Sequence, residues 1–295
     1  MSTVDQLLDS RKILIADGAW GTELAARGLQ PGESPEGWAI YQPDAVLDVA
    51  QSYVDAGAEV ILTNTFGGSR FKLAKCDLED RVEEINRRAV ELSKDAAGDD
   101  ALVFASIGPT GEFMEPLGLV SEAEMVATFA EQVKAMVAGG ADGLLVETMT
   151  DLGEAKAALQ AAKQHFDGPV VVSMTFDKGP KGYATMMGVT PERAAEELQA
   201  ASAEIVGSNC GHGIENMIEV ITLMRGATDL PLWAKPNAGM PKLVDGQTVF
   251  TQTPEETAAH FEALVEAGAR IVGGCCGTTP EHIRALVDAR NAIVE

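Results

Sequence analysis

Two adjacent cysteines lie inside a cluster of glycines near the C-terminus, in the stretch GGCCGTTPEH. The chain has 295 residues and only four cysteines, so their placement side by side is unusual. Neighbouring side chains on a regular strand point to opposite faces. Cys275 and Cys276 can therefore face one centre only where the backbone leaves strand geometry. The surrounding glycines permit that departure, because they accept conformations that other residues avoid.

A third cysteine, Cys210, ends another run of β-forming residues, EIVGSNC. If both runs are strands of one barrel, three thiolates can meet one ion at its mouth. Sulfur-only ligation favours Zn²⁺ at about 2.3 Å, and three protein ligands leave a fourth position open, as in catalytic sites. Such a centre can bind an incoming thiol and lower its pKa, which prepares a nucleophile that can accept a methyl group.

These cysteines have alternative roles. An adjacent pair can be two small buried residues or a vicinal disulfide, and it is the third cysteine at a related strand end that favours a metal. His212, two residues after Cys210, is an alternative ligand. Cys76, in LAKCDLED, has no partner at a strand end, and we expect an ordinary helix or loop residue there.

Two carboxylates also lie at the ends of predicted strands, and one amide follows another strand. Asp17 opens DGAWGTEL, where a carboxylate can hold an ammonium group or cap a turn. Glu147 follows four apolar residues in LLVETMTD, so its charge must face the mouth or be paired. Two carboxylates facing a thiolate-rich zinc suit a substrate that carries both an amine and a thiol. Asn237, in KPNAGMP, is predicted to orient a zinc ligand.

Eight short runs rich in β-branched or apolar residues alternate with segments of helical spacing. The predicted strands are residues 12–17, 60–65, 102–108, 143–148, 169–175, 204–210, 230–236 and 270–276. The predicted helices are residues 43–56, 78–97, 121–138, 151–165, 191–203, 213–225, 254–267 and 280–292. This alternation predicts an α/β fold, a (β/α)₈ TIM barrel that forms a single domain over residues 1–295. A doubly wound open sheet is the alternative, but no G-x-G-x-x-G follows the first strand. In a barrel, the carboxyl ends of the strands would bring the cysteines and carboxylates together.

Composition limits the possible partners. The net charge is −23, from 22 basic and 45 acidic residues, and a surface of that sign repels phosphate backbones, so nucleic acid is excluded as a partner. No apolar run is long enough to span a membrane, and the N-terminus lacks the pattern of a secretory signal. Four cysteines do not make a disulfide scaffold, so we expect a reducing, cytoplasmic setting.

The motifs DGAWGTEL, TNTFGG, GPTGE, VET, SNCG, KPNAG and GGCCGTTPEH resemble, in this order, the homocysteine-binding domain of the homocysteine S-methyltransferases. The resemblance runs from about residue 11 to residue 290 and implies a (β/α)₈ barrel. It implies one zinc ion held by Cys210, Cys275 and Cys276. It also implies that the amino-acid part of homocysteine is held at Asp17, Gly18, Thr63 and Glu147.

The resemblance further implies an enzyme that forms methionine, in which the zinc-bound thiolate of homocysteine attacks a methyl donor. Relatives use betaine, S-methylmethionine, S-adenosylmethionine, or methylcobalamin carried on other domains. Betaine enzymes carry an aromatic residue suited to a quaternary ammonium where this chain has Gly67 and Gly68. We expect open space there, which slightly favours a methylcorrinoid (methylcobalamin) supplied by a separate protein over betaine or another methylated osmolyte. The alternative function is a non-enzymatic zinc- or thiol-binding barrel that serves as the methyl-acceptor subunit of a larger complex.

Overall fold

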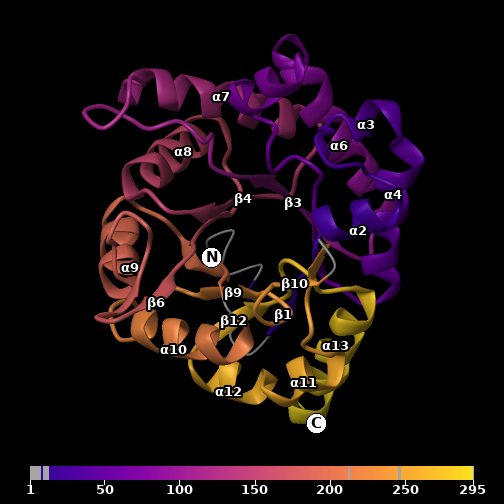
Figure 1. Ribbon diagram of the computed structural model, residues 1–295, viewed down its shortest axis with the longest axis vertical. Helices are drawn as coiled ribbons and strands as arrows, with labels where there is room; N and C mark the ends of the chain where they lie inside the picture. The colour runs from indigo at the N-terminus through magenta and orange to yellow at the C-terminus, as the bar shows by residue number, and fades with distance from the viewer. Residues whose placement is uncertain (1–7, 9–12, 212, 245–246, 295) are drawn as a thin grey trace.

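The computed structural model describes residue 8 and residues 13–211, 213–244 and 247–294. Eight parallel strands form a ring that helices enclose (Figure 1). They are β1 (Leu14–Ile15), β2 (Val60–Leu62), β3 (Leu102–Ile107), β4 (Gly143–Met149), β5 (Val170–Met174), β8 (Ile205–Cys210), β9 (Leu232–Pro236) and β12 (Ala269–Val272). β1 pairs with β12, and a parallel bridge from Ala16 to Val60 joins β1 to β2. The ring therefore closes, which confirms the predicted single-domain (β/α)₈ barrel. The start of the first predicted strand, at residue 12, lies outside the described residues.

Helices follow the strands around the barrel. They are α2 (Gly21–Ala26), α3 (Trp38–Tyr41), α4 (Pro43–Asp55), α5 (Arg70–Leu73), α6 (Val82–Ala97), α7 (Glu122–Ala138), α8 (Leu152–His165), α9 (Pro191–Ala200), α10 (Ile214–Arg225), α11 (Pro254–Ala259), α12 (Phe261–Glu266) and α13 (Pro280–Val294), with short 3₁₀ turns at Ala74–Cys76 and Glu79–Arg81. Four of these helices are capped at the N-terminus by a side chain that accepts a hydrogen bond from the backbone N–H three residues later. The capping residues are Ser121, Asp151, Thr190 and Thr253. The helix predicted over residues 254–267 is divided in two at His260.

The interior of the barrel is filled by large side chains placed next to glycines. The rings of Phe104 and Trp233 stack with centroids 6.3 Å apart. A Cβ at Gly143 would lie 2.5 Å from the Phe104 ring, and a Cβ at Gly207 would lie 2.0 Å from the carbonyl oxygen of Trp233. Gly143 thus leaves room for the Phe104 ring, and Gly207 lets β8 lie close to the backbone of β9.

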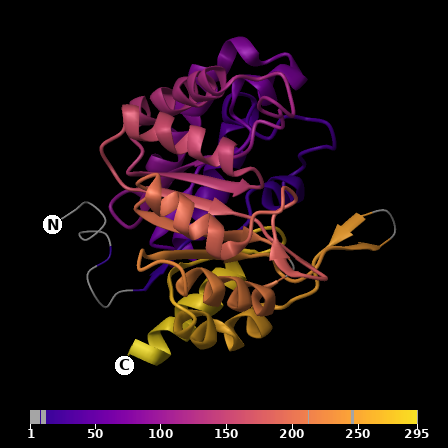
Figure 2. The same ribbon diagram turned by 90° about the vertical axis from the view of Figure 1, so that its left-hand side faces the viewer.

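Two antiparallel hairpins extend the loops that follow β5 and β9, and neither is among the predicted strands. One pairs β6 (Asp177–Gly179) with β7 (Gly182–Ala184), and the other pairs β10 (Lys242–Val244) with β11 (Gln247–Val249). Figure 2 shows the second hairpin projecting from the side of the barrel opposite to the end of α13. Within the described part of the chain, none of the helices is both long and apolar enough to cross a membrane.

Candidate active site

The three cysteines named from the sequence meet at the carboxyl end of the barrel. Cys210 is the last residue of β8, whereas β12 ends at Val272 and the chain then turns to carry Cys275 and Cys276 in a loop. The Sγ atom of Cys210 lies 3.2 Å from that of Cys275 and 4.0 Å from that of Cys276. All three are free thiols, and their sulfur atoms lie within 4.8 Å of one another. The sixth and eighth strands thus bring three sulfurs to one point, separated by β9 as in the predicted strand order.

The loop that carries the adjacent cysteines is held by backbone hydrogen bonds. The Gly274 N–H donates to the carbonyl of Asp17 at 2.9 Å, and the Cys275 N–H donates to the carbonyl of Pro236 at 2.8 Å. A Cβ on Gly274 would lie 2.3 Å from Thr278 Oγ1, and Gly277 has a φ of 80°. The predicted strand therefore ends four residues early, because the glycines allow a turn that places both thiols on the same side.

Asn209 connects this loop to two strands. Its Nδ2 lies 3.7 Å from Cys275 Sγ and donates to Thr148 Oγ1 at 2.6 Å. Its Oδ1 accepts from the Thr148 N–H at 2.8 Å and from Ser173 Oγ at 2.7 Å. Thr148 and Cys210 have φ values of 59° and 65°, in the left-handed region that a β-branched or bulky residue rarely adopts. These hydrogen bonds fix the strained ends of β4 and β8 beside the thiols.

The three thiols influence one another's ionisation. Hydrogen bonds from Cys210 and then from Cys275 lower the pKa of the Cys276 thiol to about 3. The hydrogen bond to Cys275, followed by that to Cys276 and by burial, raises the pKa of the Cys210 thiol. One thiolate is thus stabilised by its neighbours, and further deprotonation of the group requires a positive charge.

Glu147 projects from β4 into the same region and is almost fully buried. Desolvation raises the pKa of its carboxyl to about 7, although the positive charge of Lys235 opposes the shift. Ser106 Oγ donates to Glu147 Oε1 at 2.5 Å, and the Ser106 N–H donates to Thr63 Oγ1 at 3.1 Å. The wall formed by β2, β3 and β4 therefore presents a carboxylate that is poised to change its charge near neutral pH.

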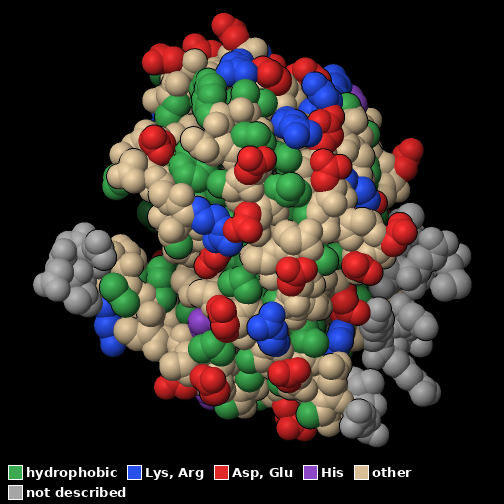
Figure 3. Space-filling model, turned by 90° about the vertical axis from the view of Figure 1, so that its right-hand side faces the viewer, with side chains coloured by type: hydrophobic (Ala, Val, Ile, Leu, Met, Phe, Trp, Pro, Cys, Tyr) green, Lys and Arg blue, Asp and Glu red, His purple; other side chains and the backbone are tan. Residues whose placement is uncertain are grey.

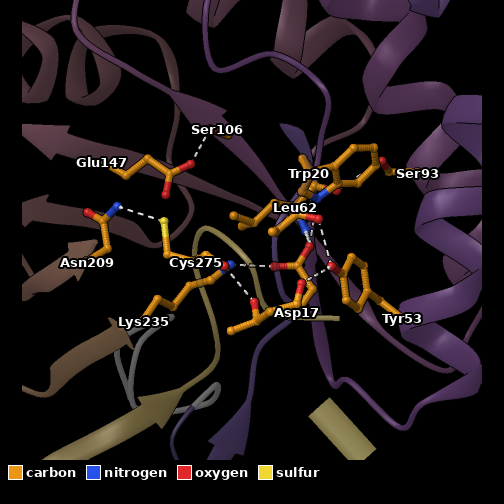
Figure 4. Close-up of polar contacts among 12 residues, drawn as sticks. Asp17, Trp20, Tyr53, Leu62, Ser93, Ser106, Glu147, Asn209, Lys235 and Cys275 are labelled. Carbon is orange, nitrogen blue, oxygen red and sulfur yellow. Dashed lines mark hydrogen bonds and ion pairs between the residues drawn. The ribbon is translucent and has the colours of Figure 1, made fainter. Parts of the chain in front are cut away.

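Asp17 is fully buried, and its carboxylate contacts the ammonium group of Lys235 (Figure 4). Its Oδ1 accepts a hydrogen bond from Lys235 Nζ at 2.5 Å. Its Oδ2 accepts from Trp20 Nε1 at 2.8 Å and from the Leu62 N–H at 2.7 Å. Both oxygens are thus engaged by groups of the protein itself.

A cavity of about 460 Å³ opens at this end of the barrel. Its wall includes Gly18, Thr63, Glu147, Lys235 and the three cysteines, but not Asp17. A Cβ on Gly18 would lie 2.7 Å from the hydroxyl of Tyr53, so only glycine fits there. A second cavity, of about 710 Å³, contains none of the site residues named from the sequence.

Asn237 lies beside the cysteines but contacts backbone, not sulfur. Its Nδ2 donates to the carbonyl of Gly211 at 2.7 Å, so it holds the chain just after Cys210. Its Oδ1 is buried and has no hydrogen-bond partner among the described residues. The alternative ligand His212 lies outside the described residues. Cys76 ends a 3₁₀ turn and is not part of the cysteine group.

The expectation of open space at Gly67 and Gly68 is wrong. A Cβ on Gly67 would lie 2.7 Å from Glu36 Oε1, which accepts the Gly67 N–H at the same distance. A Cβ on Gly68 would lie 2.2 Å from Asn86 Oδ1. The two glycines therefore allow close packing of polar side chains, and Glu36, which sequence reasoning missed, joins Trp20 and Phe66 on the cavity wall.

Comparisons with known proteins agree with this architecture. The family model described as homocysteine S-methyltransferase matches residues 14–290. Methionine synthase from Mycobacterium tuberculosis is 30% identical over 305 residues, covering 96% of this chain and 25% of the relative. Methionine synthase from Mycobacterium leprae is 28% identical over 298 residues, covering 95% of this chain and 24% of the relative. The chain thus spans about a quarter of the length of these curated relatives.

Solved structures give a match along the whole barrel. The homocysteine methyltransferase MmuM from Escherichia coli, in its metallated form, is 25% identical with a TM-score of 0.80, covering 97% of this chain and 99% of that one. Its oxidised form gives a TM-score of 0.82 over 98% of this chain and 99% of that one. The resemblance predicted from the motifs is confirmed: the chain belongs to the homocysteine S-methyltransferase family.

Proposed function

We propose that this chain is a zinc-dependent homocysteine S-methyltransferase that forms methionine. The observation that carries the proposal is the convergence of three free thiols beside the Glu147 carboxylate in one cavity at the barrel mouth. The family to which the chain belongs supports methyl transfer to homocysteine, and the E. coli relative was solved in a metallated form.

The donor set fits zinc. Tetrahedral ligation at about 2.3 Å would separate two sulfurs by roughly 3.8 Å, between the two distances that Cys210 makes to its neighbours. The unpartnered Oδ1 of Asn237 is a further buried acceptor beside these loops. When bound by Cys210, Cys275 and Cys276, zinc would supply the positive charge that keeps the homocysteine sulfur deprotonated near neutral pH.

The other residues of the cavity wall would orient the amino acid. Glu147 would accept a hydrogen bond from the substrate ammonium. Ser106 would hold the Glu147 carboxylate in place by donating to its Oε1. Thr63 in turn accepts the Ser106 N–H, while Gly18 lets Tyr53 and Thr278 pack close to the cavity. Asp17 would act on the amino-acid part of the substrate through Lys235, with which it is paired. With the amino acid held in this way, the homocysteine sulfur would form a bond to the methyl carbon. The bond between this carbon and the donor would break, and the remainder of the donor would keep its electron pair.

Two classes of methyl donor are proposed. A methylcorrinoid carried by a separate protein is the first. The resemblance implies relatives that carry methylcobalamin on other domains, and the relatives named methionine synthase are about four times as long as this chain. A small methylated cation such as betaine, dimethylsulfoniopropionate or S-methylmethionine is the second. The carboxylate of Glu36 and the rings of Trp20 and Phe66 on the cavity wall favour it, because aromatic faces and carboxylates attract such cations.

The deciding experiment offers homocysteine and each donor separately to the zinc-loaded chain and measures methionine by mass spectrometry. Cys276→Ala is the matched inactive control. Turnover with free methylcobalamin alone would support the first donor class, and turnover with a small cation would support the second. Zinc and homocysteine binding without methionine from any donor would contradict an independent enzyme. It would instead favour a methyl-acceptor subunit of a larger complex.

A further inference from the structure

Lys235 places a positive charge in the wall of a cavity whose other described ionisable lining residues are carboxylic acids and thiols. Its side chain comes from the end of β9 and is only 1% exposed, yet it contributes to the cavity wall. The ammonium nitrogen lies 5.8 Å from the centre of the Trp233 ring. Burial raises the pKa of Glu147 to about 7, and the positive charge of Lys235 opposes that shift. Buried lysines are rare unless they are paired, and the partner here is Asp17.

The arrangement around Asp17 determines what this end of the cavity can bind. Asp17 is fully buried and does not line the cavity. Its carboxylate already accepts N–H groups from Trp20, Leu62 and Lys235. A substrate ammonium at this end would meet the ammonium of Lys235 first and would be repelled. An anion would instead gain a charge-assisted hydrogen bond.

The opposite side of the cavity carries the complementary charge. Glu147, on β4, offers a carboxylate, and Lys235, on β9, offers an ammonium, with Cys275 between them in Figure 4. An amino acid has one group of each sign on the same carbon. We propose that Lys235 binds the α-carboxylate of the amino-acid substrate, while Asp17 positions the lysine and Glu147 takes the substrate ammonium. This inference rests on the proposed function, because it assigns the two ends of homocysteine within the same cavity.

Two N–H donors besides Lys235 bind the Asp17 carboxylate. The indole of Trp20 and the Leu62 backbone both donate to Oδ2, so the lysine is needed only at Oδ1. Lysine has three N–H donors, and a bond to a substrate carboxylate is compatible with the bond to Asp17. Asp17 is therefore a positioning residue in this scheme, and Lys235 is the group that touches the substrate.

The experiment compares two thiols by titration calorimetry on the zinc-loaded chain. L-homocysteine carries the thiol, the amine and the carboxylate, whereas 3-aminopropane-1-thiol lacks only the carboxylate. We expect the unmodified chain to prefer homocysteine by roughly 10- to 100-fold, the range for a hydrogen bond to a charged group. Lys235→Met should abolish this preference by weakening homocysteine binding alone, and leave the affinity for the aminothiol unchanged.

Two further variants separate binding from folding. Lys235→Met leaves Asp17 buried and unpaired, so the double variant Asp17→Asn with Lys235→Met removes both charges and should show the same loss of preference. Lys163→Met, at a surface lysine 3.8 Å from Glu204, is the matched control and should keep the preference. Zinc content and melting temperature are measured for every variant.

Each remaining outcome contradicts the assignment in a different way. If the Lys235 variants retain the preference for homocysteine, the carboxylate is bound elsewhere. If they lose affinity for both thiols equally, the lysine only supports the structure. If the unmodified zinc-loaded chain binds neither thiol, the proposed function itself fails, and this inference fails with it.

Discussion

At the scale of single residues, the site is governed by side chains whose partners come from distant parts of the chain. Asn209 joins the ends of β4 and β8 to the cysteine loop by hydrogen bonds to Thr148, Ser173 and Cys275. Such a buried amide fixes the orientation of a thiolate and so prepares it for a metal. The sulfurs of the proposed metal site are thus held by a polar network that includes Asn209 and its partners on neighbouring strands.

Removing a single ligand should release the metal. We expect the purified chain to hold about one zinc ion and Cys210→Ala or Cys276→Ala to lose it, because two thiolates complete too little of a tetrahedral site. Cys76→Ala is the control, since this thiol is outside the group of three. Elemental analysis after dialysis measures the metal. Full zinc occupancy in both ligand variants would exclude the three-cysteine site.

Glu147 should make stability depend on pH in the metal-free chain. Burial raises its pKa to about 7 in the folded state, above the value in the unfolded chain. The stability linked to this group is thus complete below the unfolded pKa and is lost as the pH rises through about 7. Glu147→Gln does not titrate, so its free energy of unfolding relative to the unmodified chain should increase by roughly 2–4 kcal/mol between pH 4.5 and pH 8.

Denaturant unfolding at several pH values measures this difference, and all other titrating groups cancel between the two proteins. Glu84→Gln is the control, because the pKa of this exposed carboxyl is lowered by its hydrogen bond to Arg81. Its difference should stay constant over the same pH range. A flat difference for Glu147→Gln would show that its carboxyl ionises normally in the folded state.

At the scale of elements, local patterns predict the barrel strands but not the additions to the loops. The eight buried parallel strands appear in the sequence as runs of apolar and β-branched residues, and all eight are present. β6 and β7 lie in FDKGPKGYA, where glycine, proline and lysine are typical of a loop. Their pairing depends on the hairpin itself and leaves no apolar period in the sequence. Local patterns also do not predict where β12 ends, because the glycines after it turn the chain before the predicted strand is complete.

Some residues of the site could likewise be predicted from local patterns, whereas others depend on contacts between distant parts of the chain. The cysteines could be found because strand ends in a barrel converge and because three sulfurs at two such ends are typical of a metal site. The pairing of Lys235 with Asp17 joins residues 218 positions apart, and no local pattern records it. The contact of Glu36 with Gly67 likewise depends on the loop before α3, so the cavity wall could not be predicted from strand ends alone.

The register of β8 against β9 determines where Cys210 lies. Gly207 pairs with Trp233, and a Cβ at Gly207 would lie 2.0 Å from the Trp233 carbonyl oxygen. We expect Gly207→Ala to destabilise the fold by about 1–3 kcal/mol or more, as overpacking does, and to weaken zinc binding by shifting Cys210. Gly226→Ala is the control, because its Cβ would lie no closer than 3.4 Å to any neighbour. Denaturant unfolding and zinc content decide the matter, and equal effects at both glycines would contradict the prediction.

At the scale of the whole molecule, the excess of negative charge opposes compactness. The net charge is −23, and Figure 3 shows acidic side chains spread over the face it displays. Surface ion pairs such as those of Arg87 with Glu83 and Glu91 offset some of this repulsion. Exposed pairs are each worth at most about 1 kcal/mol, however, and salt weakens them as well. The long-range repulsion among unpaired carboxylates is therefore expected to dominate the response to salt.

Raising the ionic strength should thus stabilise this chain. Between about 0.01 M and 0.5 M salt the Debye length falls from roughly 30 Å to below 10 Å, which screens repulsion across the molecule. We expect the melting temperature at pH 7.5 to rise by several degrees over this range, measured by scanning calorimetry with sodium chloride and with potassium chloride. The same step at pH 5 should have a smaller effect, because carboxylates take up protons and the net charge shrinks. A melting temperature that falls with salt at pH 7.5 would show that the surface ion pairs outweigh the repulsion of the excess carboxylates.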